Sequence, residues 1–367
     1  MELCDLAPGY VRAIAPYPPG KPIGELAREM GLNEIDIVKL ASNENPLGPS
    51  PLALEAVKRC LPELARYPDG AGFELKAALV AKYGVATNQI VLGNGSNDVL
   101  EFAARAFLKA GDSAVFSQHA FAVYPLVVQA VGARSIEVAA KAFGNDPRAL
   151  LEAIEDSTRI VFLANPNNPT GTLLAADELL RFIEQVPRNV LVVLDEAYYE
   201  YLAPEVAPGS VAWLARFPNL LIARTFSKAY GLAGLRVGFA LCHQEVADML
   251  NRVRQPFNVS TVAQVAAVAA LGDTAHLSKS VALNFAGMKQ ITEGLGKLKL
   301  DYIPSFGNFL SFRIGNATAM YQRLLKRGVI VRPVANYGMP DYLRVSIGLT
   351  AENEKFLNAL ASAMQEN

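Results

Sequence analysis

Cysteine is scarce in this sequence, which contains only Cys4, Cys60 and Cys242. Three widely spaced cysteines form neither a disulfide framework nor a metal-ligand cluster. We therefore expect idle or buried thiols in a reducing compartment, and no metal site.

Long apolar runs are also missing. The longest apolar stretch, Val262 to Leu271, is about half of a membrane span and is interrupted by Gln264. The first residues, Met1 to Asp5, lack the basic and apolar regions of a signal peptide. We expect a soluble, cytoplasmic protein.

An excess of one charge is absent as well. The 34 basic and 35 acidic residues give a formal net charge of -1, and no long run of one sign occurs. This balance argues against a nucleic-acid or membrane-surface partner, although it leaves room for a local basic pocket that binds a small anion.

The length of 367 residues, of which 51% are hydrophobic, is too great for one ordinary core, so two domains are expected. Residues 1–45 are rich in proline and glycine, which is typical of an arm that lies on the rest of the protein outside its core. We predict an arm at 1–45, a large domain at 46–256, and a small C-terminal domain at 257–367 that the arm joins.

The large domain is predicted to be an α/β fold, because short apolar strands alternate with helical patterns. The expected strands are 90–92, 114–117, 160–164, 190–194 and 220–223, with helices at 97–108 and 175–185. Unbroken apolar strands indicate a mostly parallel sheet that is covered on both faces. Residues 235–241 follow the preceding strand too closely for a crossover, so this strand should be antiparallel.

The pattern changes after Pro256. Helices are expected at 259–271 and 282–298, strands at 309–313 and 342–347, and a last helix from 351. This arrangement is typical of a smaller α+β domain.

Polar residues follow several of the predicted strands, at the sheet edge where open α/β folds bind ligands. In residues 92–98, Gly93 and Gly95 allow close backbone approach, and Ser96 can cap a helix whose free N–H groups favour phosphate. A plain strand–turn–helix fits equally well. The third glycine of the dinucleotide fingerprint is missing, which argues against a dinucleotide-binding module.

Three further motifs carry polar groups. Residues 165–171, with two prolines around Asn168, form a rigid loop after a strand. Asp195 follows an apolar run and needs a partner, either a structural cation or a cation on a ligand. Lys228 lies among small residues, between two hydroxyls and Arg236, and this setting favours a chemical role over a solvated lysine.

The order Asn168-Pro-Thr-Gly, Asp195-x-x-Tyr198, Ser227-Lys228 and Arg236 resembles the fold-type I pyridoxal-5′-phosphate (PLP) dependent aminotransferases over nearly the whole chain. The resemblance implies that Lys228 binds PLP as a Schiff base and then moves a proton as base and acid. It implies that Asp195 pairs with the ring nitrogen, so that the ring accepts negative charge.

The same resemblance assigns the other contacts of the cofactor. Asn168 and Tyr198 bind the 3-oxygen of the ring. The phosphate is held by Gly95, Ser96, Asn97, Thr225, Ser227 and Arg236. An aromatic ring should stack on the cofactor. Phe121 is the first candidate and Tyr124 the second, because His119 and Ala120 precede Phe121 where relatives often have a proline.

Residues 40–51, 66–69 and 308–309 resemble histidinol-phosphate aminotransferases in particular. This resemblance implies a homodimer in which Tyr67 reaches the PLP phosphate of the neighbouring subunit. It implies L-histidinol phosphate as the substrate, with 2-oxoglutarate and glutamate as the second pair. Arg332 and Arg344 would bind the substrate phosphate or carboxylate, with Asn168 and Tyr17 also at the substrate.

Alternatives stay open on the sequence alone. An aromatic amino-acid aminotransferase would use the same cofactor residues, and a threonine-phosphate decarboxylase would also need arginines for phosphate. A non-catalytic PLP-binding regulator is disfavoured, because Lys228, Asp195, Asn168 and Tyr198 are all present and no helix–turn–helix extension is seen.

Overall fold

The computed structural model describes residues 3–17 and 19–366. Its helices are α1 (Gly9–Arg12), α2 (Ile23–Met30), α3 (Pro51–Cys60), α4 (Phe73–Tyr83), α5 (Ser96–Phe107), α6 (Val123–Ala130), α7 (Pro147–Glu152), α8 (Ala176–Gln185), α9 (Gln244–Val253), α10 (Thr261–Gly272), α11 (Thr274–Lys297), α12 (Ala317–Lys326) and α13 (Thr350–Met364). Its strands are β1 (Val38–Lys39), β2 (Ile90–Gly93), β3 (Ser113–Ser117), β4 (Arg134–Val138), β5 (Thr158–Ala164), β6 (Leu191–Asp195), β7 (Leu220–Thr225), β8 (Gly238–Cys242), β9 (Tyr302–Ile303), β10 (Phe309–Arg313), β11 (Val329–Ile330), β12 (Arg332–Pro333) and β13 (Tyr342–Ser346).

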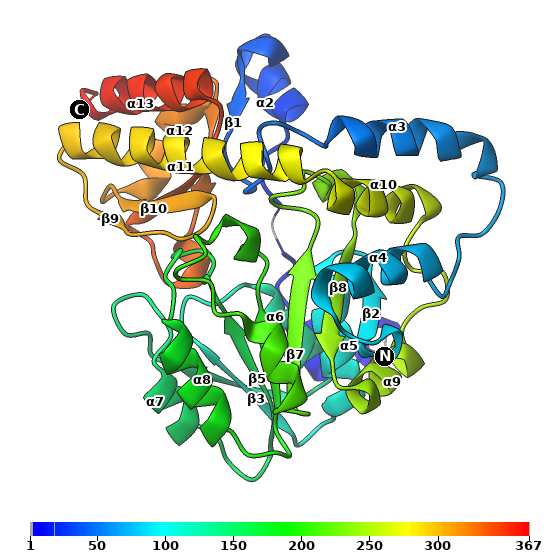
Figure 1. The fold of residues 1–367 in the computed structure, drawn as a ribbon. Coiled ribbons are helices and arrows are strands. Elements are labelled where there is room, and N and C mark those ends of the chain that lie inside the picture. Colours follow the sequence, from blue (N-terminus) through cyan, green and yellow to red (C-terminus); the bar gives the residue numbers. More distant parts are fainter. Residues whose placement is uncertain (1–2, 18, 367) are drawn as a thin grey trace.

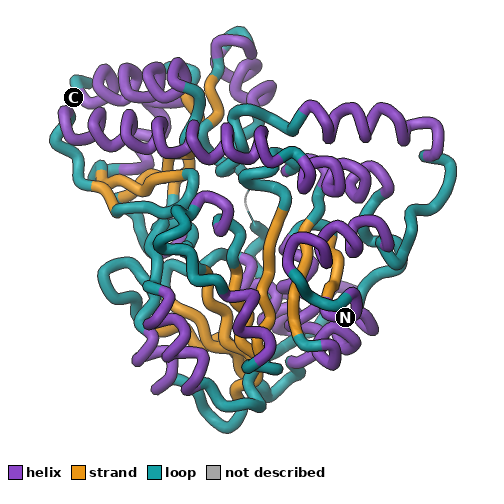
Figure 2. Tube along the Cα trace, in the orientation of Figure 1, coloured by secondary structure: helices purple, strands orange, loops and turns teal. Residues whose placement is uncertain are grey.

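The large sheet has the order β2-β8-β7-β6-β5-β3-β4. Its pairs are parallel except for those of β8, which runs antiparallel to both β2 and β7. The predicted fold class, a mostly parallel sheet with one antiparallel strand, is confirmed. Figure 1 shows this sheet in the lower part of the molecule, and Figure 2 shows its strands between helices.

Alternate residues of the strands enter two separate cores. Val161, Leu163 and Leu194 belong to the core on one face of the sheet, whereas Phe162 and Val193 belong to the core on the other. Because successive side chains of a strand point to opposite faces, a strand that is covered on both faces must be apolar throughout. This is why β5 and β6 read as unbroken apolar runs in the sequence.

A second sheet, of order β12-β13-β10-β9, is covered by α11, α12 and α13 and has its own core. In Figure 1 the long helix α11 extends from this small sheet toward α10 and α3. The domain boundaries at 45 and 256 stay predictions; α10, which follows the second boundary, packs its alanines into a core of the large sheet.

The prediction that the arm lies outside the cores is wrong. Helix α2 buries Leu26 and Ala27 against Leu325 and Ile330, and β1 pairs with β11 in parallel. Leu40 is part of the core of the small sheet. Proline and glycine set the ends of the short arm elements, but these elements still carry enough apolar surface to be buried.

Several element boundaries also differ from the prediction. The strand expected at 235–241 begins at Gly238, because Ala233–Leu235 form a 3₁₀ turn and Arg236 has a positive φ of 55°. The helix expected at 282–298 begins at Thr274, with the Asp273 side chain accepting the hydrogen bond of the cap. The edge strand β4 was not expected, since its residues are partly exposed.

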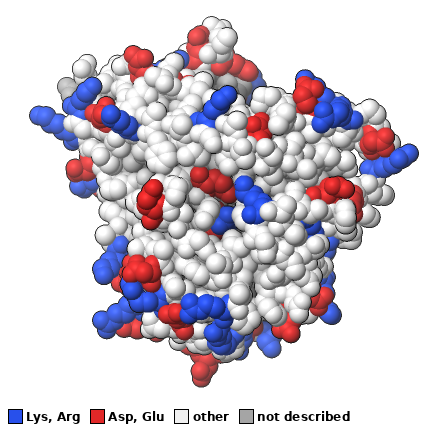
Figure 3. All heavy atoms as spheres, viewed as in Figure 1, with Lys and Arg blue, Asp and Glu red and all other residues white. Residues whose placement is uncertain are grey.

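Among residues 3–17 and 19–366, no helix has the length and apolarity that crossing a membrane requires. Acidic and basic side chains are interspersed over the face drawn in Figure 3. This distribution agrees with the near-zero net charge.

Candidate active site

A cavity of about 210 Å³ lies at the carboxyl ends of β5, β6 and β7, whose last residues, Ala164, Asp195 and Thr225, line it. The small sheet and the arm complete its walls. The predicted site residues that line the cavity are Tyr17, Ser96, Asn97, Phe121, Asn168, Asp195, Tyr198, Thr225, Ser227, Lys228, Arg236, Arg332 and Arg344. Gly95 and Tyr67 are not among the lining residues. Segments that are far apart in the sequence therefore form one site.

Lys228 extends into the cavity from the loop after β7. Its Nζ donates a hydrogen bond to the Ser42 carbonyl at 3.1 Å and lies 5.7 Å from the centre of the Tyr198 ring. Burial, followed by the positive charge of Arg344, lowers the pKa of Lys228 to about 8. A substantial share of this amine is therefore neutral, and nucleophilic, near physiological pH.

Asp195 is buried at the end of β6 and is held on both oxygens. The Tyr124 hydroxyl donates to Oδ2 at 2.9 Å, and the Ala197 N–H donates to Oδ1 at 3.2 Å. Burial raises the pKa of Asp195 to about 6, although the two hydrogen bonds act in the opposite direction and lower it. In residues 3–17 and 19–366, no basic side chain forms a salt bridge with Asp195, so a cation on a ligand would stabilise it.

The small sheet brings two arginines to the cavity. Arg332 of β12 and Arg344 of β13 are direct partners on adjacent antiparallel strands, and both are buried. The Arg344 guanidinium donates to Asn168 Oδ1 at 2.5 Å and to the Ala41 carbonyl at 2.8 Å. Its Nε is buried without a partner in the described structure. An anion between these side chains would relieve their repulsion.

A third arginine lies beside the start of α5. Arg236 donates to Ser227 Oγ and to the Asn94 carbonyl, each at 3.4 Å, and the Ser227 N–H donates to Thr225 Oγ1 at 3.1 Å. A Cβ on Gly95, which has a φ of 81°, would overlap the Arg236 guanidinium. The glycine therefore makes room for a cation at the N-terminus of a helix, an arrangement that suits a phosphate.

The expected role of Ser96 as a helix cap is wrong. Ser96 is the first residue of α5, and Gly95 occupies the cap position without a side-chain cap. The Asp98 carboxylate instead accepts a hydrogen bond from the Asn94 N–H at 2.8 Å. The N–H groups at the start of α5 are thus left to face the cavity, where Ser96 and Asn97 line it.

The two aromatic candidates have different positions. Phe121 lines the cavity, whereas Tyr124 is fully buried, stacks on Phe162 with ring centres 4.9 Å apart, and supports Asp195. This placement favours Phe121 for stacking on a ligand ring. The role of Tyr124 was missed, because a local pattern does not reveal which carboxylate a buried phenol contacts.

The two tyrosines of the N-terminal part also differ. Tyr17 lines the cavity, and the Arg332 guanidinium lies 5.4 Å from the centre of its ring. Tyr67 is 83% exposed and stacks on Phe257 with ring centres 4.8 Å apart. Within one chain, Tyr67 therefore contributes nothing to the cavity wall.

Sequence reasoning missed three further polar residues of the wall. Ser42, Asn43 and Tyr337 line the cavity. Ser42 and Asn43 belong to the segment 40–51 that carries the family resemblance, which was the available signal. Tyr337 lies in a short 3₁₀ helix after β12, and no motif marks it. Among the described residues 3–17 and 19–366, no group of three or more histidine, cysteine, aspartate or glutamate side chains could hold a metal ion.

The cavity thus combines the amine of Lys228, the buried carboxylate of Asp195 and the donors around Arg236, which suit an anion. A comparison with known protein families agrees with this combination. The model of the family "Aminotransferase class I and II" matches residues 35–360. The chain belongs to this family. The aminotransferase is 63% identical over 366 residues to histidinol-phosphate aminotransferase 2 of Nitrosospira multiformis, covering 100% of this chain and 93% of that protein. It is 62% identical to the histidinol-phosphate aminotransferase of Methylobacillus flagellatus, covering 99% of each chain.

Solved structures agree with this result. The histidinol-phosphate aminotransferase of Sinorhizobium meliloti, in complex with pyridoxal-5′-phosphate, superimposes on this aminotransferase with a TM-score of 0.89. The two are 30% identical, and the match covers 97% of each chain. The aspartate aminotransferase of Thermus thermophilus with maleate has a TM-score of 0.79 at 23% identity, covering 96% of this chain and 98% of that one, and so shares the fold. The family predicted from the motifs is confirmed.

Proposed function

We propose that this aminotransferase uses PLP to transfer the amino group of L-histidinol phosphate to 2-oxoglutarate, which yields imidazole-acetol phosphate and glutamate in histidine biosynthesis. Support comes from relatives of 63% and 62% identity that carry the name of this activity over nearly their full length. The structural relative from Sinorhizobium meliloti is itself a complex with pyridoxal-5′-phosphate. A cytoplasmic location is part of the proposal.

The observation that carries the substrate proposal is the buried pair of Arg332 and Arg344. Two like charges on directly opposed residues lower stability unless an anion lies against them. Arg236 belongs to a different part of the chain, the turn before β8, and lies beside the start of α5. The cavity thus offers one cationic place for a cofactor phosphate and another for a substrate anion, which is what a phosphorylated amine and a dicarboxylate both require.

The residues present fit PLP. Arg236, Ser227 and the free N–H groups at the start of α5 form a cradle of hydrogen-bond donors. Such a cradle suits an anion such as the cofactor phosphate. Asp195 is a buried carboxylate that a protonated ring nitrogen would satisfy. When bound, PLP supplies an aldehyde for the amino group and an electron-poor ring that accepts electrons from the substrate.

Each side chain then has a role that follows from its position. Lys228, whose pKa is lowered to about 8, would bind the cofactor aldehyde, and its amine would then move the proton of the substrate α-carbon to C4′ of the cofactor. Asn168, Tyr198, Thr225 and Phe121 all line the cavity. Asn168 and Tyr198 would hold the 3-oxygen, Thr225 would support the phosphate cradle, and Phe121 would stack on the ring. Tyr17 covers the substrate phosphate from the arm, and Asn168 orients Arg344 toward it.

A homodimer with shared sites is the second part of the proposal. Tyr67 is 83% exposed and lies outside the cavity of its own chain, which leaves it available to a neighbour. We expect the partner's Tyr67 to donate a hydrogen bond to the cofactor phosphate. The division into an arm (1–45), a large domain (46–256) and a small domain (257–367) remains part of the same proposal.

Complementation between inactive variants tests the shared site. Homodimers of Lys228→Ala and of Tyr67→Phe should both be impaired. In a mixed dimer, the site that carries Lys228→Ala receives the substituted Tyr67→Phe side chain of its partner and is inactive. The other site has an intact Lys228 and receives an intact tyrosine. Mixing and reassociating the two variants should therefore restore up to a quarter of wild-type activity, since half of the dimers are mixed and each has one intact site (an order-of-magnitude expectation from random pairing). No gain on mixing would refute the shared site.

A comparison of half-reactions tests the substrate. The purified PLP form is mixed with L-histidinol phosphate, L-phenylalanine or L-threonine phosphate, and the cofactor absorbance and any carbon dioxide are followed. Fast conversion by histidinol phosphate without gas supports the proposal. A preference for phenylalanine would assign Arg332 and Arg344 to a carboxylate, and carbon dioxide from threonine phosphate would indicate a decarboxylase.

A further inference from the structure

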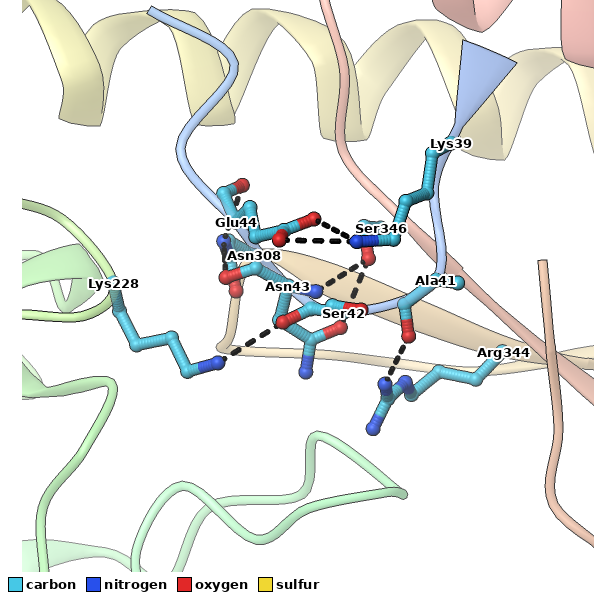
Figure 4. A network of polar contacts seen from close by, with 9 residues as sticks. All are labelled: Lys39, Ala41, Ser42, Asn43, Glu44, Lys228, Asn308, Arg344 and Ser346. Atoms are coloured by element: carbon cyan, nitrogen blue, oxygen red, sulfur yellow. Dashed lines mark hydrogen bonds and ion pairs between the residues drawn. The ribbon is translucent and has the colours of Figure 1, made fainter. Parts of the chain in front are cut away.

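Asn43 lies where the arm, the large sheet and the small sheet meet. It is buried, and its backbone has a positive φ of 55°. Figure 4 shows Asn43 beside Ser346 and Asn308. The two residues before it, Ala41 and Ser42, contact Arg344 and Lys228. The Asn43 carbonyl accepts a hydrogen bond from Asn308 Nδ2 at 3.0 Å, which holds the unusual backbone conformation. Asparagine tolerates this conformation better than most residues.

The hydrogen bonds around Asn43 have one consistent direction. The backbone N–H of Asn43 can only donate, and its partner at 2.8 Å is Ser346 Oγ, which must therefore accept. The Ser346 hydroxyl keeps its own proton for another partner, and Asn43 Oδ1 lies 3.0 Å away. Because Oδ1 is the acceptor there, the NH₂ group of Asn43 must face the other way, and it donates to Tyr198 Oη at 2.9 Å.

The last step of this chain concerns the Tyr198 proton. A phenol oxygen that accepts from Asn43 cannot direct its own proton at the same NH₂ group. Tyr198 lines the cavity, and its ring packs edge-on against Phe309. The O–H bond is therefore directed toward the cavity, where the proposed function places the 3-oxygen of the cofactor.

We propose that Asn43 is a positioning residue that, together with Ser346, fixes the Tyr198 hydroxyl as a hydrogen-bond donor to the cofactor. The inference rests on the proposed cofactor and is independent of the identity of the amino substrate. Hydrogen bonds in such a chain polarise one another, so donation from Asn43 strengthens donation by Tyr198. A stronger donor at the 3-oxygen favours the more negative, deprotonated form of the lysine-bound chromophore and lowers its pKa.

Other charges also act on this chromophore, so the test must separate them from Asn43. The ionisable groups that face Tyr198 or Lys228 are Glu44 of the arm, Tyr124 of α6, Asp195 of β6, Tyr201 after β6, Arg236 after β7, Tyr337 after β12 and Arg344 of β13. A neutral substitution at position 43 leaves all of them in place. Asn43→Gly is suitable, because glycine adopts a positive φ without strain.

The experiment is a double-mutant cycle of Asn43→Gly and Tyr198→Phe, read by the pH dependence of the absorbance of the holoenzyme with no amino donor present. We expect Asn43→Gly to raise the pKa of the chromophore by about half a pH unit or more. In the Tyr198→Phe background, the same change should have no effect, because the hydroxyl through which it acts is gone. A purely structural role would lower the melting temperature of both the apo and holo forms without this coupling.

Ser346→Ala is the second variant. It keeps asparagine at position 43, although the Asn43 backbone N–H loses its acceptor along with the side chain. It removes the hydroxyl that orients the Asn43 amide, so it should raise the pKa in the same direction, again only when Tyr198 is present. If Asn43→Gly does not fold, this variant decides the question. An unchanged pKa, or an equal shift with and without the Tyr198 hydroxyl, would overturn the proposal. Absence of the chromophore in the wild-type protein would instead contradict the proposed cofactor.

Discussion

Replacing Asp195 by asparagine should make the cofactor-free protein more stable while it damages the enzyme. The side chain is buried, and its pKa is raised from 3.8 to about 6 by burial. A carboxyl whose folded pKa is raised binds protons more tightly in the folded state than in the unfolded state. Its ionisation therefore costs stability progressively as the pH rises from 3.8 through 6.

The magnitude follows from these two pKa values. A difference of about two pH units corresponds to about 3 kcal/mol of lost stability at pH 7 and above. Asparagine has nearly the same shape, and its amide can pair with the Tyr124 hydroxyl and the Ala197 N–H. We expect Asp195→Asn to recover part of the cost, with about 3 kcal/mol as the upper bound.

The assay is urea unfolding of the cofactor-free wild type and variant at pH 7.5 and at pH 4.5, with equal protein concentrations. The variant should be the more stable at pH 7.5, and the difference should shrink toward pH 4.5, where the wild-type carboxyl is protonated. With PLP bound, the same variant should turn over about 100-fold more slowly or worse, because a buried ion pair is broken. Equal stabilities at pH 7.5, a difference that persists at low pH, or normal turnover would refute the reasoning.

Three further variants test the site. After treatment with borohydride, Lys228→Ala should retain no covalently linked cofactor. Binding of PLP by the wild-type apoprotein should accelerate as the pH rises through about 8, since the neutral amine reacts. A binding rate that does not change with pH would contradict this. Gly95→Ala should weaken cofactor binding about 10- to 100-fold by displacing Arg236, whereas Gly111→Ala, at a similar φ of 93° with nothing within 4 Å, should not. Arg344→Gln should raise the KM for histidinol phosphate and for 2-oxoglutarate about 30-fold or more with a smaller change in cofactor affinity; the exposed Arg313→Gln serves as its control.

Much of the chemistry is readable from local sequence. Polar residues that directly follow apolar strands must gather at one sheet edge, so the sequence alone places Asp195, Thr225 and Lys228 together, and all three line the cavity. The antiparallel direction of β8 follows from a connection too short for a crossover. These inferences succeed because strand periodicity and connection length are properties of neighbouring residues.

What the sequence by itself determined is therefore the sheet, the polar residues at its edge and the family. Only the tertiary structure decided which distant residues support them. Asn43 meets Tyr198 across 155 positions, and Tyr124 meets Asp195 across 71. The tertiary structure also decided that the arm is part of a core and that Tyr67 lies outside the cavity of its own chain. Such contacts depend on how separate elements pack, and no pattern within one element specifies which distant surface it will bury against.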